Sequence, residues 1–373
     1  MVQYSAEFPS RPVAQLLGSN GPIHAVTYSS TPSTYILTGS SDRSIRLYNP
    51  STTTTTTSPS SPESSIIPTG KLIQTYSNSH AYEVLSLSIS SQNDKFASSG
   101  GDRTVHLWDV STAQTIRRFG SSSTTHSHTG RVNAVTFAGH DDSLVISGGL
   151  DCTVRIWDLK SHGSSSKPIQ VLSEARDAVT SVAVGPSSNA EIVAGSVDGR
   201  VRTYDVRMGR CVTDVMPSSV TSLSMSRDGK TLLVGSLDSK IRLMDRRDGQ
   251  CLKTYGGGGW KNTELRVQSC LGGKERWVVT GDELTSSSSS GEEVVVKNNE
   301  GRIWAWDLMT GKLVAKVAVP WGPDNGKRMV IGRDGKEKER KNVVSCIAWQ
   351  DGGFGSQFCV GGTSGVVTVF GQP

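Results

Sequence analysis

One eight-residue pattern recurs along the chain and restricts its fold more than any other feature. Its best copies begin with Asp, alternate apolar and polar residues, and end in an aromatic residue followed by Asp. Successive copies start 60, 49, 47, 40, 62 and 64 residues apart. This recurrence predicts a repeat architecture rather than the two domains that a length of 373 residues alone would suggest. The seven copies are Asp42–Asn49, Asp102–Asp109, Asp151–Asp158, Asp198–Asp205, Asp238–Asp245, Glu300–Asp307 and the degraded Ser364–Gly371.

Each repeat predicts four antiparallel strands. The alternating copy itself is typical of a half-buried strand. Two strands precede it, as in Arg131–Ala138 and Ser143–Gly149, and a fourth follows it, as in Cys251–Tyr255. Seven units of four strands predict an all-β fold, a seven-bladed β-propeller. The seventh unit lacks an outer strand, and Arg11–Leu17 near the N-terminus can supply it, which would remove exposed strand edges.

We expect a single domain over residues 1–373, interrupted by insertions. The predicted blade cores end near residues 49, 109, 158, 205, 245, 307 and 370. Ser/Thr/Gly-rich or charged composition predicts flexible inserted loops at 51–68, 283–299 and 321–341. We call the face on which each blade's first strand begins the upper face. The first insertion is expected on the lower face and the other two on the upper face.

The spacing of His and Trp-Asp in these repeats resembles the Gly-His…Trp-Asp layout of the WD-repeat family, and the resemblance covers nearly the whole chain. It implies a buried polar tetrad in two blades, where Asp accepts from imidazole and imidazole accepts from a hydroxyl. A fully satisfied network of this kind makes a blade rigid. The other blades depart from the pattern, since Met244 replaces Trp and Ala194 replaces Ser, and we expect them to depend more on apolar packing. The two tetrads are His80, Ser98, Asp102, Trp108 and His128, Ser147, Asp151, Trp157.

Four stretches, residues 80–87, 173–182, 194–209 and 236–245, resemble the mitogen-activated protein kinase organizer subfamily of WD-repeat proteins. Glu-Ala-Arg-Asp at 174–177 is the most specific of these, because it replaces the usual Gly-His. The resemblance implies a non-catalytic scaffold for MAP-kinase modules and for spliceosomal complexes of pre-mRNA splicing. It also implies a location in the nucleus and the cytoplasm.

Signals of enzymes and cofactors are missing from the sequence. It contains no phosphate-binding loop, nucleophile elbow or metalloprotease motif. The Ser, His and Asp sets are better explained as blade tetrads than as catalytic triads. His126 and His128 lack the second Cys/His pair of a zinc site. We therefore expect no enzyme activity, no cofactor, no metal and no small-molecule substrate. No apolar run approaches the roughly 18–20 residues of a membrane helix, so we expect no membrane partner.

Proteins are the expected partners, bound where upper-face loops converge on the central channel. Aromatic and arginine side chains most often anchor such interfaces. For any single residue, a solvated loop or local ion pair remains an equal alternative. The candidate partner-binding residues are Tyr82, Glu83, Arg131, Arg176, Asp177 and Trp260.

Three further hypotheses remain open. The net charge is +5, and Lys327–Lys341 contains seven basic and three acidic residues, so the basic loop 327–341 could contact RNA or simply be solvated. The stretch Tyr204–Arg207 imperfectly resembles the Trp-Asp-x-Arg signature of cullin-type ubiquitin-ligase substrate receptors. Ser58 and Ser61 each precede Pro, and the implied kinase link makes them candidate phosphosites.

Overall fold

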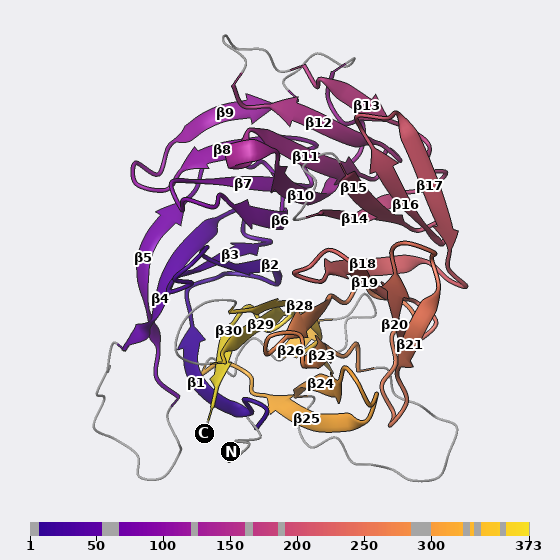
Figure 1. The fold of residues 1–373 in the computed structure, drawn as a ribbon. Helices are drawn as coiled ribbons and strands as arrows, with labels where there is room; N and C mark the ends of the chain where they lie inside the picture. The colour runs from indigo at the N-terminus through magenta and orange to yellow at the C-terminus, as the bar shows by residue number, and fades with distance from the viewer. Residues whose placement is uncertain are drawn as a thin grey trace, which may run out of the picture.

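The computed structural model describes residues 7–53, 67–120, 126–160, 167–185, 191–284, 300–323, 329–331, 337–350 and 356–372. Seven four-stranded antiparallel sheets are arranged in a ring (Figure 1). The described residues include one short 3₁₀ helix, η1 (His140–Asp142). The prediction of an all-β, seven-bladed propeller is therefore confirmed.

The first three blades follow one another in chain order. Blade 1 contains β2 (Ile23–Tyr28), β3 (Ile36–Ser40), β4 (Ile45–Thr53) and β5 (Gly70–Tyr76). Blade 2 contains β6 (Val84–Ile89), β7 (Lys95–Gly100), β8 (Val105–Asp109) and β9 (Thr115–Phe119). Blade 3 contains β10 (Val132–Ala138), β11 (Leu144–Gly149), β12 (Val154–Asp158) and β13 (Gln170–Leu172).

The next three blades repeat this order. Blade 4 contains β14 (Val179–Val184), β15 (Glu191–Ser196), β16 (Arg200–Asp205) and β17 (Arg210–Val215). Blade 5 contains β18 (Val220–Met225), β19 (Thr231–Ser236), β20 (Lys240–Asp245) and β21 (Cys251–Tyr255). Blade 6 contains β22 (Ser269–Gly272), β23 (Trp277–Thr280), β24 (Gly301–Asp307) and β25 (Leu313–Val319).

Blade 7 joins the two ends of the chain. It contains β28 (Val344–Trp349), β29 (Phe358–Gly362), β30 (Val367–Gly371) and, as its outer strand, β1 (Arg11–Leu16). Arg11 is paired with Gly371 and Leu16 with Val367. Figure 1 shows the indigo β1 beside the yellow β30. The prediction that an N-terminal strand closes the ring is confirmed.

The hydrophobic core lies between neighbouring blades. Apolar residues on the facing sides of two sheets pack together, as Leu37 and Tyr76 of blade 1 do with Val84 and Phe96 of blade 2. Ala14 of β1 belongs to a cluster that also contains Ile23 and Tyr48 of blade 1. Each blade is therefore packed on both sides, and the core is divided into separate clusters, one between each pair of neighbouring blades.

The insertions are partly strand. β4 extends to Thr53, which pairs with Gly70, so the predicted loop 51–68 begins inside a strand. In the predicted loop 321–341, β26 (Met329–Ile331) pairs with β27 (Glu337–Glu339). Residues 54–66, 285–299, 324–328 and 332–336, including the candidate phosphosites Ser58 and Ser61, lie outside the described residues. No helix in the described part of the chain combines the length and apolar character needed to cross a membrane.

Candidate functional site

Blades 2 and 3 each contain a histidine-centred hydrogen-bond network. In blade 3, His128 Nδ1 is 2.9 Å from Asp151 Oδ1, and His128 Nε2 is 2.8 Å from Ser147 Oγ. Trp157 Nε1 donates to the same serine oxygen at 2.9 Å. The serine oxygen accepts the indole N–H, and its own single proton is donated to His128 Nε2. The ring proton of the neutral imidazole is then on Nδ1, which donates to Asp151.

Blade 2 repeats the same geometry with its own four residues. His80 lies 2.8 Å from Asp102 and 2.7 Å from Ser98, and Trp108 Nε1 donates to Ser98 Oγ at 2.8 Å. Ser98 and Ser147 are fully buried and lie between His and Trp. Neither serine has a free side from which to attack a substrate, so these sets fit a structural role rather than a catalytic triad.

The same network sets the protonation of its members. Burial raises the pKa of Asp151, but hydrogen bonds from His128 and Thr153 outweigh burial and hold the pKa at about 2. Burial lowers the pKa of His128 below its ordinary value, despite the opposing effect of Asp151. The blade therefore contains a neutral imidazole and an ionised carboxylate at neutral pH.

Blades 1, 4 and 5 contain an arginine-centred network, which the expectation that they depend more on apolar packing did not include. In blade 4, Arg202 Nη2 lies 2.6 Å from Asp198 Oδ2, and Arg202 Nη1 donates to Ser196 Oγ at 2.9 Å. Ser196, two residues before the Asp, takes the place of the serine that Ala194 replaces. The equivalent residues are Ser40, Asp42, Arg46 in blade 1 and Ser236, Asp238, Arg242 in blade 5.

One group of side chains in the described residues is close enough to share a cation. His80, Asp102 and His106 in blade 2 each offer one ligand atom, and these atoms lie within 4.8 Å of one another. However, His80 bonds to Asp102 and Ser98, and His106 Nε2 lies 3.0 Å from Thr104 Oγ1. The three atoms that face one another therefore take part in an internal hydrogen-bond network, while His106 Nδ1 is buried without a partner among the described residues.

The upper face separates the predicted partner-binding residues into two sets. Glu83 and Arg131 line one hollow at the mouth of the central channel, with a volume of about 510 Å³. We call it the channel hollow. Tyr82, which is 61% exposed, and the exposed Arg176 and Asp177 lie on the same face but do not line the hollow.

Trp260 is not an exposed anchor, and its assignment as a partner-binding residue is wrong. The side chain is 3% exposed, packs edge-to-face against Trp306, and donates from Nε1 to the carbonyl of Gly281 at 2.8 Å. The glycine run before it indicated an exposed loop, but an indole with a buried partner for its N–H favours the core.

The channel hollow also contains residues that the sequence analysis missed. His24 of blade 1 and Arg266, three residues before β22, line it together with Arg131. Arg266 Nη1 donates to the carbonyl of Asn133 at 3.0 Å, which places its guanidinium beside the start of β10. No Gly-His pair marks the start of blade 6, so the position of Arg266 at the channel mouth had no motif to indicate it.

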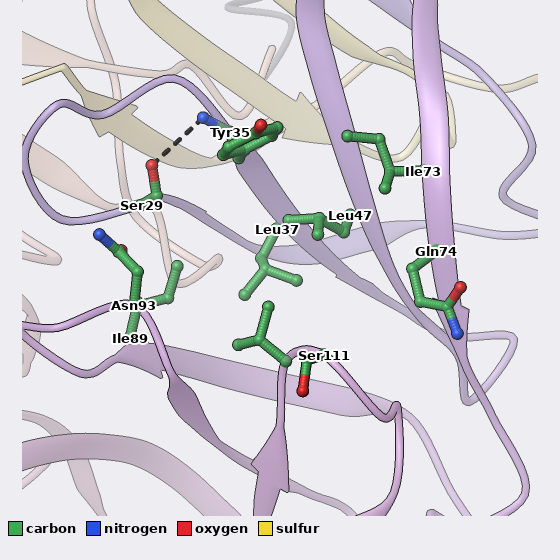
Figure 2. A pocket seen from close by; sticks show the side chains of 10 residues that line it. Ser29, Tyr35, Leu37, Leu47, Ile73, Gln74, Ile89, Asn93 and Ser111 are labelled. Carbon is green, nitrogen blue, oxygen red and sulfur yellow. Dashed lines mark hydrogen bonds between the residues drawn. The ribbon is translucent and has the colours of Figure 1, made fainter.

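A second hollow lies on the lower face between blades 1 and 2. Its volume is about 360 Å³, and its walls are mainly apolar. Figure 2 shows Leu37 and Leu47 between Ile73 of β5 on one side and Ile89 on the other. Tyr35, whose backbone N–H donates to Ser29 Oγ at 3.2 Å, lies exposed at its edge. We call it the lower groove.

Comparison with known proteins supports the assignment of the repeats. A family model described as WD domain, G-beta repeat matches residues 10–49, and one described as NUP159/214 beta propeller matches residues 81–255. The chain is 28% identical over 330 residues to the WD repeat domain-containing protein 83 homolog of Dictyostelium discoideum. The aligned region covers 81% of this chain and 87% of that protein.

Two other relatives match shorter parts of the chain. WD repeat domain-containing protein 83 of Rattus norvegicus is 37% identical over 156 residues, 42% of each chain. A guanine nucleotide-binding protein subunit beta of Zea mays is 31% identical over 151 residues, 38% of each chain.

Proposed function

We propose that the chain is a member of the WD-repeat family and that its propeller assembles the components of spliceosomal complexes and of a MAP-kinase module, in the nucleus and the cytoplasm. The propeller is a protein-interaction scaffold. The resemblance of its repeats to the MAP-kinase organizer subfamily supports these two client assemblies.

The observation that carries the scaffold role is the presence of two separate hollows on opposite faces of one ring. The lining of the channel hollow includes the charged side chains of Glu83, Arg131 and Arg266, whereas no charged residue lines the lower groove among the described residues. Partners with different chemistry can therefore bind at the same time. Two partners held on one rigid body have a raised effective concentration for each other, without any reaction carried out by the scaffold.

The direct test is affinity purification of the tagged protein from separate nuclear and cytosolic extracts, with and without nuclease, followed by mass spectrometry. We expect splicing factors in the nuclear sample after nuclease treatment, and kinases of a MAP-kinase module in the cytosolic sample. A cullin adaptor whose recovery depends on Arg207 would favour a ubiquitin-ligase receptor instead. Loss of all partners on nuclease treatment would favour RNA binding through the basic loop 327–341.

Variants on the two faces show which surface binds which partner. Tyr82→Ala and Arg176→Ala change exposed upper-face side chains, and Ile73→Ser changes the wall of the lower groove. Met309→Ala, in the exposed turn after β24, is the matched control. We expect each face to lose a different set of partners and the control to lose none. Equal recovery from all four variants would contradict binding at these surfaces.

A further inference from the structure

The channel hollow contains two arginines and a single carboxylate, that of Glu83. Arg131 precedes β10 and Arg266 lies beside the start of that strand, so the two guanidinium groups approach the hollow from blades 3 and 6. Within the described ranges, neither guanidinium forms an ion pair with a carboxylate. Arg266 Nε is also buried without a hydrogen-bond partner among those residues.

Arg266 is half-buried, and within its guanidinium group Nε is fully buried. Its Nη1 has a single neutral acceptor, the carbonyl of Asn133. Burial, and then the charge of Arg131, lower the pKa of Arg266 to about 10, yet it remains protonated at neutral pH. A buried charge without a charged partner is unfavourable, and an anion that reaches it forms strong charge-assisted hydrogen bonds.

The other charged or titratable groups in the hollow leave a small positive excess. His24 Nε2 lies 2.7 Å from Ser41 Oγ, and burial lowers the His24 pKa, so the imidazole is neutral at neutral pH. Glu83 contributes one negative charge. Two arginines and one glutamate give the hollow a net charge of +1. This net charge is balanced by one carboxylate, whereas a phosphate dianion would exceed it and would be repelled more strongly by Glu83.

The walls of the hollow also contain aliphatic side chains. Leu85, Leu265 and Val343 line it alongside the polar groups. A volume of about 510 Å³ is in the range of pockets that take several side chains. The complementary ligand therefore has a carboxylate next to apolar side chains.

We propose that the channel hollow binds an acidic side chain, flanked by aliphatic residues, from a partner protein, and that Arg131 and Arg266 hold its carboxylate. This inference rests on the proposed scaffold function, since it names the chemistry of one partner at the upper face. Arg266 Nη2, which no hydrogen bond engages in the described residues, and the guanidinium of Arg131 supply the donors, while Leu85, Leu265 and Val343 contact the aliphatic flanks.

The test is direct binding to the purified full chain by fluorescence anisotropy. The probe is a labelled peptide of alternating Leu and Glu, and its Leu-Gln counterpart is the neutral control. We expect the acidic peptide to bind at least about tenfold tighter, as one charge-assisted hydrogen bond to arginine predicts. Equal affinity of the two peptides would overturn the proposal.

Three variants locate the site and guard against misfolding. Arg131→Gln and Arg266→Gln should each weaken binding at least about tenfold, whereas Arg43→Gln, exposed on the same face outside the hollow, should leave it unchanged. Glu83→Gln should tighten binding, because it removes the one repelling carboxylate, and a misfolded protein cannot give that gain. Unchanged affinity in the Arg131 and Arg266 variants would contradict the site.

Two other probes decide between anion classes. A matched Leu-phosphoserine peptide and a labelled RNA oligonucleotide are titrated in the same way. Tighter binding of either one, lost in Arg266→Gln, would assign the hollow to phosphate and overturn the carboxylate proposal. All probes are added to purified protein, so the outcome does not depend on other cellular proteins. If no peptide binds the hollow, the copurification of splicing factors or kinases still tests the proposed scaffold function independently.

Discussion

Blades 3 and 4 place an aspartate at the same turn and pair it with different side chains. Asp151 of blade 3 lies 2.9 Å from a histidine that enters from the preceding loop, while Asp198 of blade 4 lies 2.6 Å from the arginine four residues later. Blade 3 also has an arginine four residues after its aspartate, but Arg155 Nη2 stays 3.5 Å from Asp151, and its Nη1 is buried without a partner among the described residues. Where a blade contains both the histidine and the arginine, the histidine forms the shorter contact with the aspartate carboxylate.

The residue two positions before the aspartate decides which network forms. In blades 2 and 3 it is Gly100 or Gly149, and a Cβ on Gly149 would lie 2.7 Å from His128 Nδ1. In blades 1, 4 and 5 it is a serine that bonds to the aspartate and the arginine. In blade 3 this glycine leaves room for the imidazole, whereas in blade 2 a Cβ on Gly100 would lie 3.5 Å from His80 Nδ1 and would instead overlap the backbone carbonyl of Glu83. The steric conflict between a serine at this position and the imidazole is therefore specific to blade 3.

The largest effect is expected when a blade loses its aspartate. Asp151→Ala should lower the free energy of unfolding by about 3–5 kcal/mol, because it leaves His128 and Arg155 buried without their anion. Asp238→Ala in blade 5 should have a smaller effect, since the Asp238 side chain is 23% exposed against 5% for Asp151. Urea unfolding measures both.

The control for these two variants is Asp141→Ala in the exposed η1 segment. It should stay within about 0.5 kcal/mol of the wild-type protein. If Asp151→Ala and Asp238→Ala shift the unfolding midpoint equally, the two networks do not differ as described.

Exchanging the deciding residue tests the steric rule. Gly149→Ser should lower stability by about 1–3 kcal/mol, because the new Cβ overlaps His128 and Asp151. The reverse change, Ser236→Gly, removes the serine bonds to Asp238 and Arg242 and should lower stability by about 1 kcal/mol. Thermal unfolding compares the two, and a Gly149→Ser protein as stable as wild type would refute the rule.

Lowering the pH should destabilise the blades with a histidine network before the blades with an arginine network. The pKa of His128 is lowered from 6.5, so its stabilising contribution is present above that pH and is lost as the pH falls below it. The pKa of Asp198 is lowered from 3.8 to about 2, so its contribution is present above pH 3.8 and is lost only between there and about 2.

Hydrogen exchange of the backbone amides, corrected for intrinsic rates, measures this difference at about pH 7 and about pH 5. We expect β10–β12 to lose protection at the lower pH while β14–β16 keep theirs. Loss of protection in blade 4 first, or in both blades together, would contradict the assignment.

The smallest effect is expected for surface residues that belong to neither network. Tyr82→Ala should change the free energy of unfolding by less than about 0.5 kcal/mol, because the side chain is 61% exposed. Thermal unfolding measures this, and a larger loss would show that Tyr82 supports the blade rather than the surface.

The blade count, the closing strand and both histidine tetrads could be predicted because each depends on short-range pattern. Period-two alternation defines the strands, and a histidine followed at a similar distance by a Trp-Asp pair marks the tetrads. The arginine networks also had a local signal, since a basic residue follows the aspartate by four positions at Arg46, Arg202 and Arg242. That signal was missed because the serine sits two residues from the aspartate instead of four.

The channel hollow could not be predicted in the same way. Arg131 and Arg266 lie 135 residues apart and meet only because the ring brings blades 3 and 6 to one mouth. Trp260 was predicted to bind a partner but is buried, because a glycine-rich context does not reveal whether an indole points into the core. Long-range placement of this kind depends on the packing of whole blades.

The pairing of β1 with β30 has a consequence for the time course of biosynthesis. β1 is made first among the strands, yet its partner is the last strand of the chain. At about 5–20 residues per second, a ribosome needs roughly 20–70 s to make the intervening residues. Until β30 has been made, β1 lacks its partner strand on the nascent chain, so the ring cannot close before that point.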